Sequence, residues 1–323
     1  MTKAVRFHRT GGPEVLQLDE VEVGQPGPGQ ARVRHTAIGV NFVDTYQRSG
    51  LYPMQLPQIA GNEAAGVVEA VGAGVKGLKA GDRVVYTGLV GSYAEARLAP
   101  ADRLVKLPKG ISDEQAASMF LKGMTVYYLI HRTYKVKRGE TVLWHAAAGG
   151  VGLIACQWLK KLGVKTIGTV GSDDKAALAR AHGCTHVINY ARENFVERVK
   201  EITRGKKVRV VYDPVGKSTW EGSLDCLQPF GLLVSFGNAS GPVPPVNLGV
   251  LAQKGSLYVT RPTLFTHIAA RADLEKCANA LFSVVKSGKV RIETTGRYKL
   301  ADAQAAHRDL EGRRTTGSII LLP

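Results

Sequence analysis

The chain has 323 residues, 44% of them hydrophobic and 22% charged, and its 43 Lys and Arg residues outnumber 27 Asp and Glu residues. That length predicts about two domains, and the composition is ordinary for a soluble globular protein. There is no run of 18 apolar residues and no secretory leader, so we expect a cytoplasmic protein without a membrane span. The four cysteines form no CxxC pair, which is typical of a reducing compartment and offers no metal-binding pattern.

The first 125 residues are predicted to form a β-rich domain. Short apolar runs, among them Ala31 to Ala37 and Ala65 to Val71, are separated by turns rich in Gly and Pro. Such a pattern favours a compact, partly barrel-shaped antiparallel domain. A helix is expected from Asp113, with Ser112 as its N-cap, and helical character continues to His131.

From Thr141 onward the pattern changes to strands and helices in alternation. Near-continuous apolar strands separated by amphipathic helices continue to residue 236, which predicts a doubly wound parallel sheet, that is, a Rossmann domain. The closing strands, such as Ser318 to Leu322, suit the β-rich domain better. We therefore predict one domain from residues 1–125 and 263–323 and a dinucleotide-binding domain from residues 126–262.

A Gly-rich turn lies between the first apolar strand of this region and the helix that follows it. Its pattern is A-x-G-x-x-G, with Ala147, Gly149 and Gly152. Glycines let the backbone approach a pyrophosphate at a helix N-terminus, where free N–H groups and the helix dipole favour an anion. The turn alone leaves cofactor binding open, and the alternating pattern around it favours binding.

The net charge of +16 can attract anions or simply keep the chain soluble. Its densest groups, Lys135 to Arg138 and Arg204 to Arg209, are short and lie beside predicted turns. No aromatic residues are interleaved with them, so we expect solvated faces in preference to a nucleic-acid site.

Several motifs along the chain, in this order, resemble the quinone oxidoreductases related to ζ-crystallin, in the medium-chain dehydrogenase/reductase superfamily. They are Met1–Phe7, Gly11–Leu16, Gly39–Asp44, Gly61–Glu63, Gly123–Thr125, Ala147–Gly152 and Arg261–Leu264. The resemblance implies a GroES-like substrate domain, a Rossmann domain, an active site in the cleft between them and commonly a homodimer. It also implies reduction of quinones by NADPH in one-electron steps, giving a semiquinone.

Zinc chemistry is not expected from this chain. The zinc-dependent alcohol dehydrogenases of the superfamily have Cys where this chain has Asn41 and His where it has Asn62. Zinc prefers thiolate, imidazole and carboxylate ligands, so two amides are poor replacements. The four-Cys structural zinc lobe is absent as well, and a metal-free reduction remains.

The choice of nicotinamide cofactor depends on the end of the second Rossmann strand. That strand is followed by Gly171, Ser172 and two aspartates, and we expect Ser172 or Asp173 to cap the next helix. The resemblance then implies that Lys175 and Tyr190 face a ribose 2′-phosphate, which a cation and a hydroxyl suit. NADPH is therefore the expected cofactor, with NADH left open by the two aspartates.

The remaining site residues come from the resemblance alone. It places Asn41, Tyr46 and Tyr52 near the nicotinamide and the quinone. Tyr52 is a candidate proton donor, although a tyrosine pair is also ordinary packing. Cofactor contacts are expected from Asn41, Thr125, Tyr128, Gly149, Gly150, Val151, Gly152, Gly171, Ser172, Lys175, Tyr190, Phe236, Gly237, Asn238, Arg261 and Arg313. Arg313 is equally compatible with a surface ion pair.

Two other functions stay open at this point. An alkenal, enone or enoyl-thioester reductase would use the same fold and NADPH to reduce a C=C bond, and a site tyrosine would then supply a proton. A ζ-crystallin-like protein that binds RNA or acts structurally is the alternative that is not an enzyme.

Overall fold

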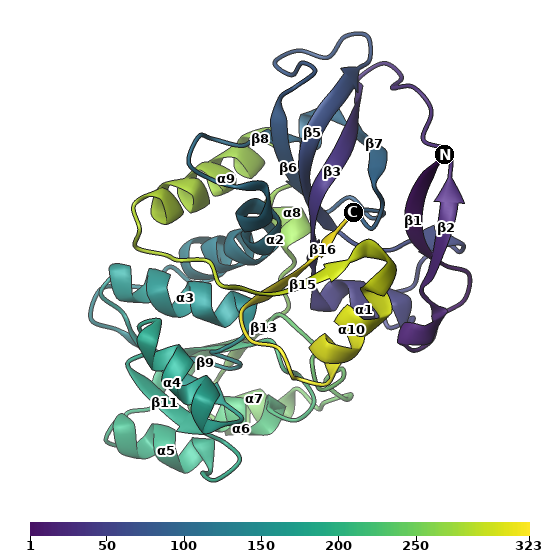
Figure 1. Cartoon of the computed structure of the whole chain (residues 1–323). Coiled ribbons are helices and arrows are strands. Elements are labelled where there is room, and N and C mark those ends of the chain that lie inside the picture. The colour runs from purple at the N-terminus through teal and green to yellow at the C-terminus, as the bar shows by residue number, and fades with distance from the viewer. The chain divides into compact units, whose positions relative to one another are not determined.

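The computed structural model describes all 323 residues, and they form two compact units. The first unit comprises Met1–Met124, Ile268–Lys286 and Ile292–Pro323, and the second comprises Thr125–His267 and Ser287–Arg291. Figure 1 follows the chain through both units. The domains expected from the sequence, residues 1–125 with 263–323 and residues 126–262, remain a prediction. No helix in either unit is both long and apolar enough to cross a membrane.

The first unit is built on a seven-stranded sheet and a three-stranded sheet. The larger has the order β15-β16-β3-β5-β6-β8, with β7 also paired to β3, and the smaller has the order β2-β1-β4. The strands are β1 (Thr2–Phe7), β2 (Gln17–Val21), β3 (Gln30–Val40), β4 (Gln58–Ile59), β5 (Glu63–Val71), β6 (Arg83–Thr87), β7 (Ala96–Pro100), β8 (Val105–Lys106), β15 (Thr294–Lys299) and β16 (Ser318–Leu322). Strand β3 pairs antiparallel with β5, β7 and β16, as the β-rich pattern predicted, with β7 near the start of β3 and β16 near its end. The pair of β15 and β16 is parallel, which the predicted antiparallel domain did not include.

The C-terminal strand closes this sheet. β16 lies antiparallel to β3, with Ile319 opposite Val40 and Leu321 opposite Ile38. These four side chains belong to one buried apolar cluster. The predicted return of the C-terminus to the N-terminal part of the chain is therefore confirmed.

Four helices accompany these sheets: α1 (Phe42–Arg48), α2 (Asp113–Tyr128), α9 (Arg271–Lys286) and α10 (Ala303–Glu311). Ser112 Oγ accepts a hydrogen bond from the backbone N–H of Gln115 at 3.1 Å, which confirms Ser112 as the N-cap of α2. A π-helix, Leu129–Thr133, follows α2. Helix α10 was not predicted: the sequence was expected to form only short strands after α9, whereas these nine residues form a helix.

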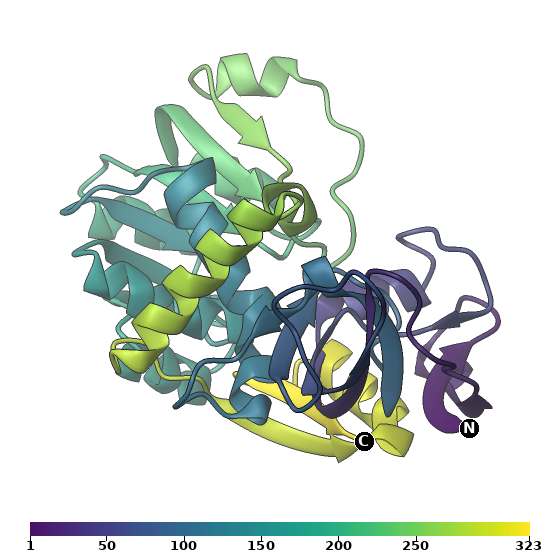
Figure 2. The same cartoon turned by 90° about the horizontal axis from the view of Figure 1, so that it is seen from above.

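The second unit is a six-stranded, wholly parallel sheet with the order β11-β10-β9-β12-β13-β14. Its elements are β9 (Thr141–Trp144), α3 (Gly150–Lys161), β10 (Lys165–Val170), α4 (Asp173–Ala181), β11 (His186–Asn189), α5 (Phe195–Ile202), β12 (Val208–Asp213), α6 (Trp220–Asp225), β13 (Leu227–Ser235), α7 (Gly249–Gln253), β14 (Tyr258–Thr260) and α8 (Leu264–His267). This order is that of the doubly wound fold, which confirms the prediction. The strands lie side by side in Figure 2.

One strand of this sheet begins earlier than predicted. A start at Gly231 was expected for β13, but the strand begins at Leu227. Pro229 and a left-handed Phe230 (φ 61°) interrupt the sequence signal. The register shifts there, so the interruption is a bulge inside the strand.

Candidate active site

The Gly-rich turn joins the carboxyl end of β9 to α3. Gly149 is the N-cap residue, no side chain caps the helix, and its first turn contains no acidic residue. A Cβ atom on Gly152 would lie 2.4 Å from the Ala146 carbonyl oxygen and 2.6 Å from that of Ala147. The turn therefore leaves the first N–H groups of α3 open to an anion, and this cradle fits the pyrophosphate of a dinucleotide.

The position of the turn in the sheet supports the same conclusion. β9 is paired with β10 on one side and β12 on the other, and the order of strands along the chain reverses at this point. In open parallel sheets, ligands bind outside the carboxyl ends of the strands at such a switch point.

Four predicted cofactor residues come together at the carboxyl ends of β10 and β11. Ser172 Oγ accepts a hydrogen bond from the backbone N–H of Lys175 at 3.3 Å, which confirms Ser172 as the N-cap of α4. The hydroxyl oxygen of Tyr190 would be 2.7 Å from a Cβ on Gly171. Tyr190 is 46% exposed, so its ring offers a surface to a ligand above Gly171.

Asp173, the first of the two aspartates that could have indicated NADH, already has partners in the protein. Asp173 accepts a hydrogen bond from Asn189 Nδ2 at 2.9 Å and forms an ion pair with Arg192. Its carboxylate also lies in the first turn of α4, where the helix dipole favours negative charge. These partners account for Asp173 without a ribose hydroxyl.

A second group of predicted residues follows β13. The backbone N–H of Phe236 donates to the Asp213 carbonyl at 2.8 Å, and Arg261 Nη1 donates to the Gly237 carbonyl at 2.9 Å. A Cβ on Gly237 would be 2.3 Å from the Pro214 carbonyl oxygen, so only glycine fits this close backbone approach. Phe236, Gly237 and Arg261 thus lie together, with Asn238 the next residue along the chain.

Two predicted residues lie in the first part of the second unit, on α2. Thr125 is buried, with 7% of its surface exposed. The ring of Tyr128 is stacked on that of His267, with centroids 4.4 Å apart.

In the first unit, Asn41 lies between β3 and α1 and is 4% exposed. Its Nδ2 donates to Glu63 Oε2 at 2.8 Å, and its backbone N–H donates to Asp44 Oδ2 at 2.8 Å. Asn62 is also a donor, because its Nδ2 lies 2.7 Å from Asp44 Oδ1 and 2.7 Å from Gln47 Oε1. The two amides at the zinc-ligand positions are therefore committed to neighbouring side chains.

Burial is the largest cause of the pKa shifts of the charged groups around Asn41. It raises the pKa of Asp44 to about 6, against the hydrogen bonds from Asn62, Asn41 and Tyr93, which lower it. Burial likewise raises the pKa of Glu63 and lowers the pKa of Lys122, whose Nζ lies 3.9 Å from Glu63 Oε2. No group of three or more His, Cys, Asp or Glu side chains is arranged to hold a metal ion.

A chain of hydrogen bonds joins Asp44 to α10. Arg48 Nη1 lies 3.0 Å from His307 Nδ1, and an arginine can only donate, so the His307 proton is on Nε2. That Nε2–H donates to the Tyr93 hydroxyl oxygen at 3.0 Å, and the Tyr93 hydroxyl donates to Asp44 Oδ2 at 3.0 Å. Because every partner donates toward Asp44, the network presents its carboxylate as an acceptor.

Tyr46 and Tyr52 form an aromatic pair beside this network. Their rings meet edge to face with centroids 5.3 Å apart, and the Phe42 ring is 6.1 Å from that of Tyr46. Tyr46 is 9% exposed, whereas Tyr52 is 37% exposed. Arg313 follows α10 in a left-handed conformation (φ 56°), apart in sequence from the other predicted residues of this unit.

Sequence reasoning missed most of the buried network. Asp44, Glu63, Tyr93 and His307 were not among the expected site residues. Asp44 had a signal, since an Asn followed three residues later by a carboxylate is typical of a helix N-terminus. His307 had none, because its partner Arg48 is 259 residues away along the chain.

Comparison with known proteins matches both halves of the chain. Residues 27–109 match the family described as the alcohol dehydrogenase GroES-like domain, which confirms the GroES-like part of the predicted fold, and residues 150–281 match the family described as zinc-binding dehydrogenase. The quinone oxidoreductase of Pseudomonas aeruginosa is 56% identical over 325 residues, covering 100% of both chains. The 2-haloacrylate reductase of a Burkholderia species is 47% identical, covering 100% of this chain and 99% of its own.

A solved structure is similar over nearly the same length. The Escherichia coli quinone oxidoreductase complexed with NADPH has a TM-score of 0.98 and 56% identity, covering 99% of this chain and 100% of that chain.

Proposed function

This chain belongs to the quinone oxidoreductase family of the medium-chain dehydrogenase/reductases, and we propose that it reduces quinones with NADPH, without zinc. Its membership confirms the resemblance inferred from the sequence motifs. The observation that carries the proposal is the uncapped, Gly-lined N-terminus of α3 at the switch point of the parallel sheet. The nicotinamide, when bound, supplies the electrons, and the chain supplies binding and position.

The cofactor choice rests on the group at the ends of β10 and β11. Lys175 and Tyr190 bind the ribose 2′-phosphate, because a cation and an exposed hydroxyl there suit a dianion. Asp173 does not oppose that phosphate strongly, since Arg192 pairs with it.

Replacing Lys175 tests this choice. Lys175→Ala removes a charge-assisted contact, so we expect the KM for NADPH to rise about 10-fold to 100-fold and the KM for NADH to change little. Arg180→Ala, at the other end of the same helix, is the matched control and leaves both values unchanged. Equal effects of Lys175→Ala on the two cofactors would exclude the assignment.

The quinone meets the face that carries Asn41, Tyr46 and Tyr52. The charged groups beside Asn41, such as Glu63 and Lys122, are buried and paired with each other, and the Asn41 amide is already a donor to Glu63. We therefore favour one-electron steps, in which each NADPH reduces two quinones by one electron each and releases one proton to water. Electron spin resonance during turnover with 1,2-quinones and 1,4-quinones tests this: a radical signal is expected, and its absence with full turnover indicates two-electron reduction.

A proton donor becomes necessary if the substrate is an activated C=C bond. This second function is favoured by the 47% identical relative named as a 2-haloacrylate reductase. The 37% exposed Tyr52 is then the candidate donor. Tyr52→Phe should leave quinone turnover unchanged and slow alkenal reduction by about 10-fold to 1,000-fold. Loss of both activities would instead assign Tyr52 to binding.

We also propose a homodimer. β14 is the last strand of the parallel sheet, and its outer edge has no partner strand. Tyr258 is 60% exposed and Val259 is 38% exposed on this edge, which stands clear at one end of the sheet in Figure 2. An apolar, unpaired edge favours pairing with a second chain. Sedimentation equilibrium should give twice the mass of one chain, and a single-chain mass would exclude the dimer.

A further inference from the structure

The positive charge of the chain is concentrated in the second unit. That unit contains 21 Lys and Arg residues and nine Asp and Glu residues, so it carries +12 of the net charge of +16. The cofactor site occupies the carboxyl ends of its strands. Most of the excess positive charge lies away from those carboxyl ends, in the segments that lead into the amino ends of the strands.

Three such segments lie side by side because the strands they enter are neighbours. β10, β9 and β12 are adjacent in the sheet, and they begin at Lys165, Thr141 and Val208. Around these starts are ten basic residues: Lys135, Lys137, Arg138, Lys160, Lys161, Lys165, Arg204, Lys206, Lys207 and Arg209. We call this group the basic edge.

Contacts within the unit show that the segments of the basic edge meet. The aliphatic part of Arg138 would be 3.0 Å from a Cβ on Gly163. Burial lowers the pKa of His131, and the charges of Lys135 and Lys161 lower it further, so both cations lie near this side chain. Lys135 and Lys161 therefore bring two of the three segments together around one side chain.

The basic edge is not neutralised by its own surroundings. None of its ten residues takes part in the ion pairs of the unit, and nine are exposed, with Lys207 half-buried. The nearby acids are engaged elsewhere. Glu201 pairs with Arg198, and Glu140 accepts hydrogen bonds from the Tyr134 hydroxyl and the backbone of Lys137.

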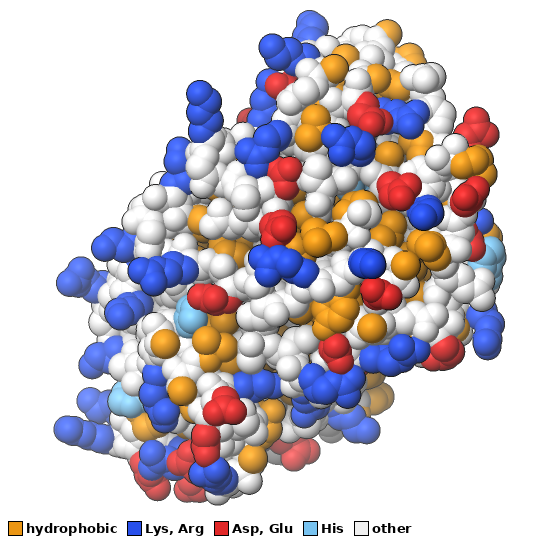
Figure 3. Space-filling model, viewed as in Figure 1, with side chains coloured by type: hydrophobic (Ala, Val, Ile, Leu, Met, Phe, Trp, Pro, Cys, Tyr) orange, Lys and Arg blue, Asp and Glu red, His pale blue; other side chains and the backbone are white.

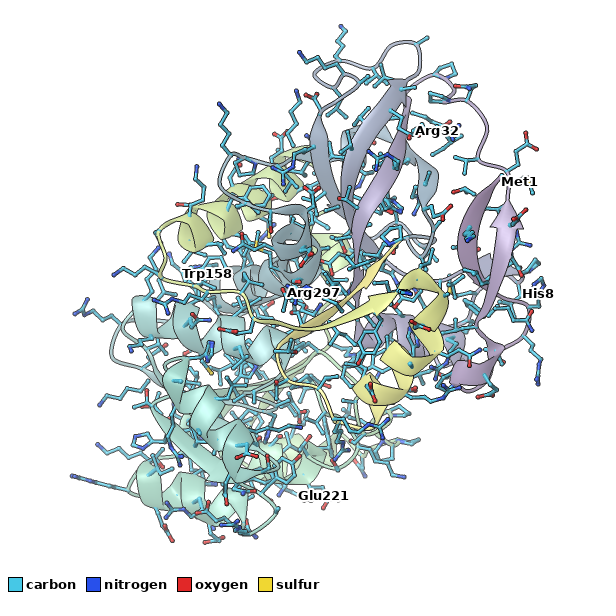
Figure 4. All side chains as sticks on the ribbon, in the orientation of Figure 1. Met1, His8, Arg32, Trp158, Glu221 and Arg297 are labelled. Carbon is cyan, nitrogen blue, oxygen red and sulfur yellow. The ribbon has the colours of Figure 1, made fainter.

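Helix capping explains only part of this arrangement. Lys160 and Lys161 lie in the last turn of α3, where cations stabilise the helix dipole. The other eight residues lie in connecting segments or at strand starts, where no helix end requires them. Figure 3 shows Lys and Arg along the margin of the molecule beside α3, with Asp and Glu among them toward α5, and Figure 4 shows long side chains projecting from the region of Trp158.

The shape of the basic edge favours an anionic lipid surface over a nucleic acid. Its residues lie at the end of α3, on short connections and at strand starts, and none of them lines the hollow beside Trp220, Asp225 and Lys254 in the same unit. No exposed aromatic side chain is interleaved with them to stack bases, and no helix projects that would enter a groove. An exposed aromatic does stand at the border: Phe230, 62% exposed, lies in the bulge of β13 opposite Arg209.

We propose that the basic edge binds the protein peripherally to anionic membranes, with Phe230 entering the headgroup layer. Basic residues near an anionic surface each strengthen binding by about fivefold, and aromatic residues favour the interface. Docking through the amino ends of the strands leaves the cofactor site at their carboxyl ends uncovered. This inference does not depend on the reaction proposed above.

A charge-reversal experiment with the full chain tests the proposal. One variant carries Lys135→Glu, Lys137→Glu and Lys206→Glu, and the matched control carries Lys76→Glu, Lys109→Glu and Lys299→Glu in the first unit. All six lysines are exposed and unpaired, so both variants change net charge equally. Binding is measured by co-sedimentation with vesicles of about 30% phosphatidylglycerol in phosphatidylcholine, and with phosphatidylcholine alone.

The wild type should bind the anionic vesicles at low salt and not the neutral ones. The basic-edge variant should lose at least about 100-fold in binding, and the control should lose much less. Phe230→Gly, which suits the left-handed backbone, should weaken the binding that persists at high salt. Melting temperature and NADPH binding of the variants verify that the fold is intact.

Three results would overturn the inference. One is no binding of the wild type to anionic vesicles at low salt. Another is an equal loss in both variants, which would mean that net charge alone is responsible. The third is tighter binding to single-stranded RNA or duplex DNA than to the vesicles, which would assign the basic edge to nucleic acid.

Discussion

The two candidate binding regions, one in each unit, present their polar groups in different ways. At the N-terminus of α3 the binding groups are backbone N–H donors, exposed because glycines keep every side chain away. Around Asn41 the groups are side chains, held by buried hydrogen bonds between residues distant in sequence. A backbone site of the first kind is sensitive to one added atom and insensitive to pH. A side-chain network of the second kind responds to pH and to the loss of one hydroxyl.

The largest effect is expected from an added methyl group in the turn. Gly152→Ala places a Cβ 2.4 Å from the Ala146 carbonyl oxygen, so the backbone must shift. The first N–H groups of α3 then no longer point at the bound pyrophosphate. We expect NADPH affinity to fall by about 100-fold or more, roughly 2.8 kcal/mol. Isothermal titration calorimetry measures this, with thermal melting to verify the fold.

Gly149→Ala is the matched control for that variant. A Cβ there has only one near neighbour, the Ala146 carbonyl oxygen at 3.3 Å, and the Gly149 backbone is in an extended conformation open to alanine. We expect a loss of about 10-fold at most. Equal losses in the two variants would contradict the steric account.

The network, in contrast, should make stability depend on pH through Asp44. Its pKa is raised from 3.8 to about 6 in the folded state, so the folded chain binds that proton more tightly than the unfolded chain. The free energy of unfolding therefore falls by about 3 kcal/mol as pH rises from about 4 to about 6, and this contribution is constant above that window.

Comparison with Asp44→Asn isolates this contribution. Burial, more than the nearby Arg48, lowers the pKa of His307 to about 3. The folded chain therefore loses stability through His307 as pH falls, which is opposite to the effect of Asp44. Both proteins share His307, so the difference between their urea unfolding free energies reports on Asp44. A difference that stays constant across the window would contradict the predicted shift.

A smaller effect should follow from removing one hydroxyl of the network. Tyr93→Phe leaves His307 Nε2 without an acceptor and Asp44 with one donor fewer, which costs about 2 kcal/mol of stability. It should also lower kcat if the network orients Asn41.

Tyr86→Phe provides the comparison for that variant. Tyr86 is fully buried too, and its hydroxyl pairs with His35 at 2.9 Å, away from Asn41. It should reduce stability by a similar amount and leave kcat unchanged. A similar fall of kcat in both variants would show that only general stability matters.

Local signals explain what was predicted correctly. The Gly turn, the Ser172 cap and helices such as α5 each depend on a few neighbouring residues, and all three lie where expected. The start of β13 was wrong because Pro229 and Phe230 look like a turn, whereas the neighbouring strands hold them as a bulge.

The sequence by itself determined the parallel sheet and the dinucleotide turn, because each depends on neighbouring residues with a fixed period or spacing. The resemblance to the family identified the amides at the zinc-ligand positions. Only the tertiary structure decided which groups surround those amides. His307 reaches Arg48 and Tyr93 because β16 pairs with β3 and brings α10 back to α1. The tertiary structure also decided that three separate basic segments form the basic edge, since the order of strands in a sheet follows from packing and not from their order along the chain.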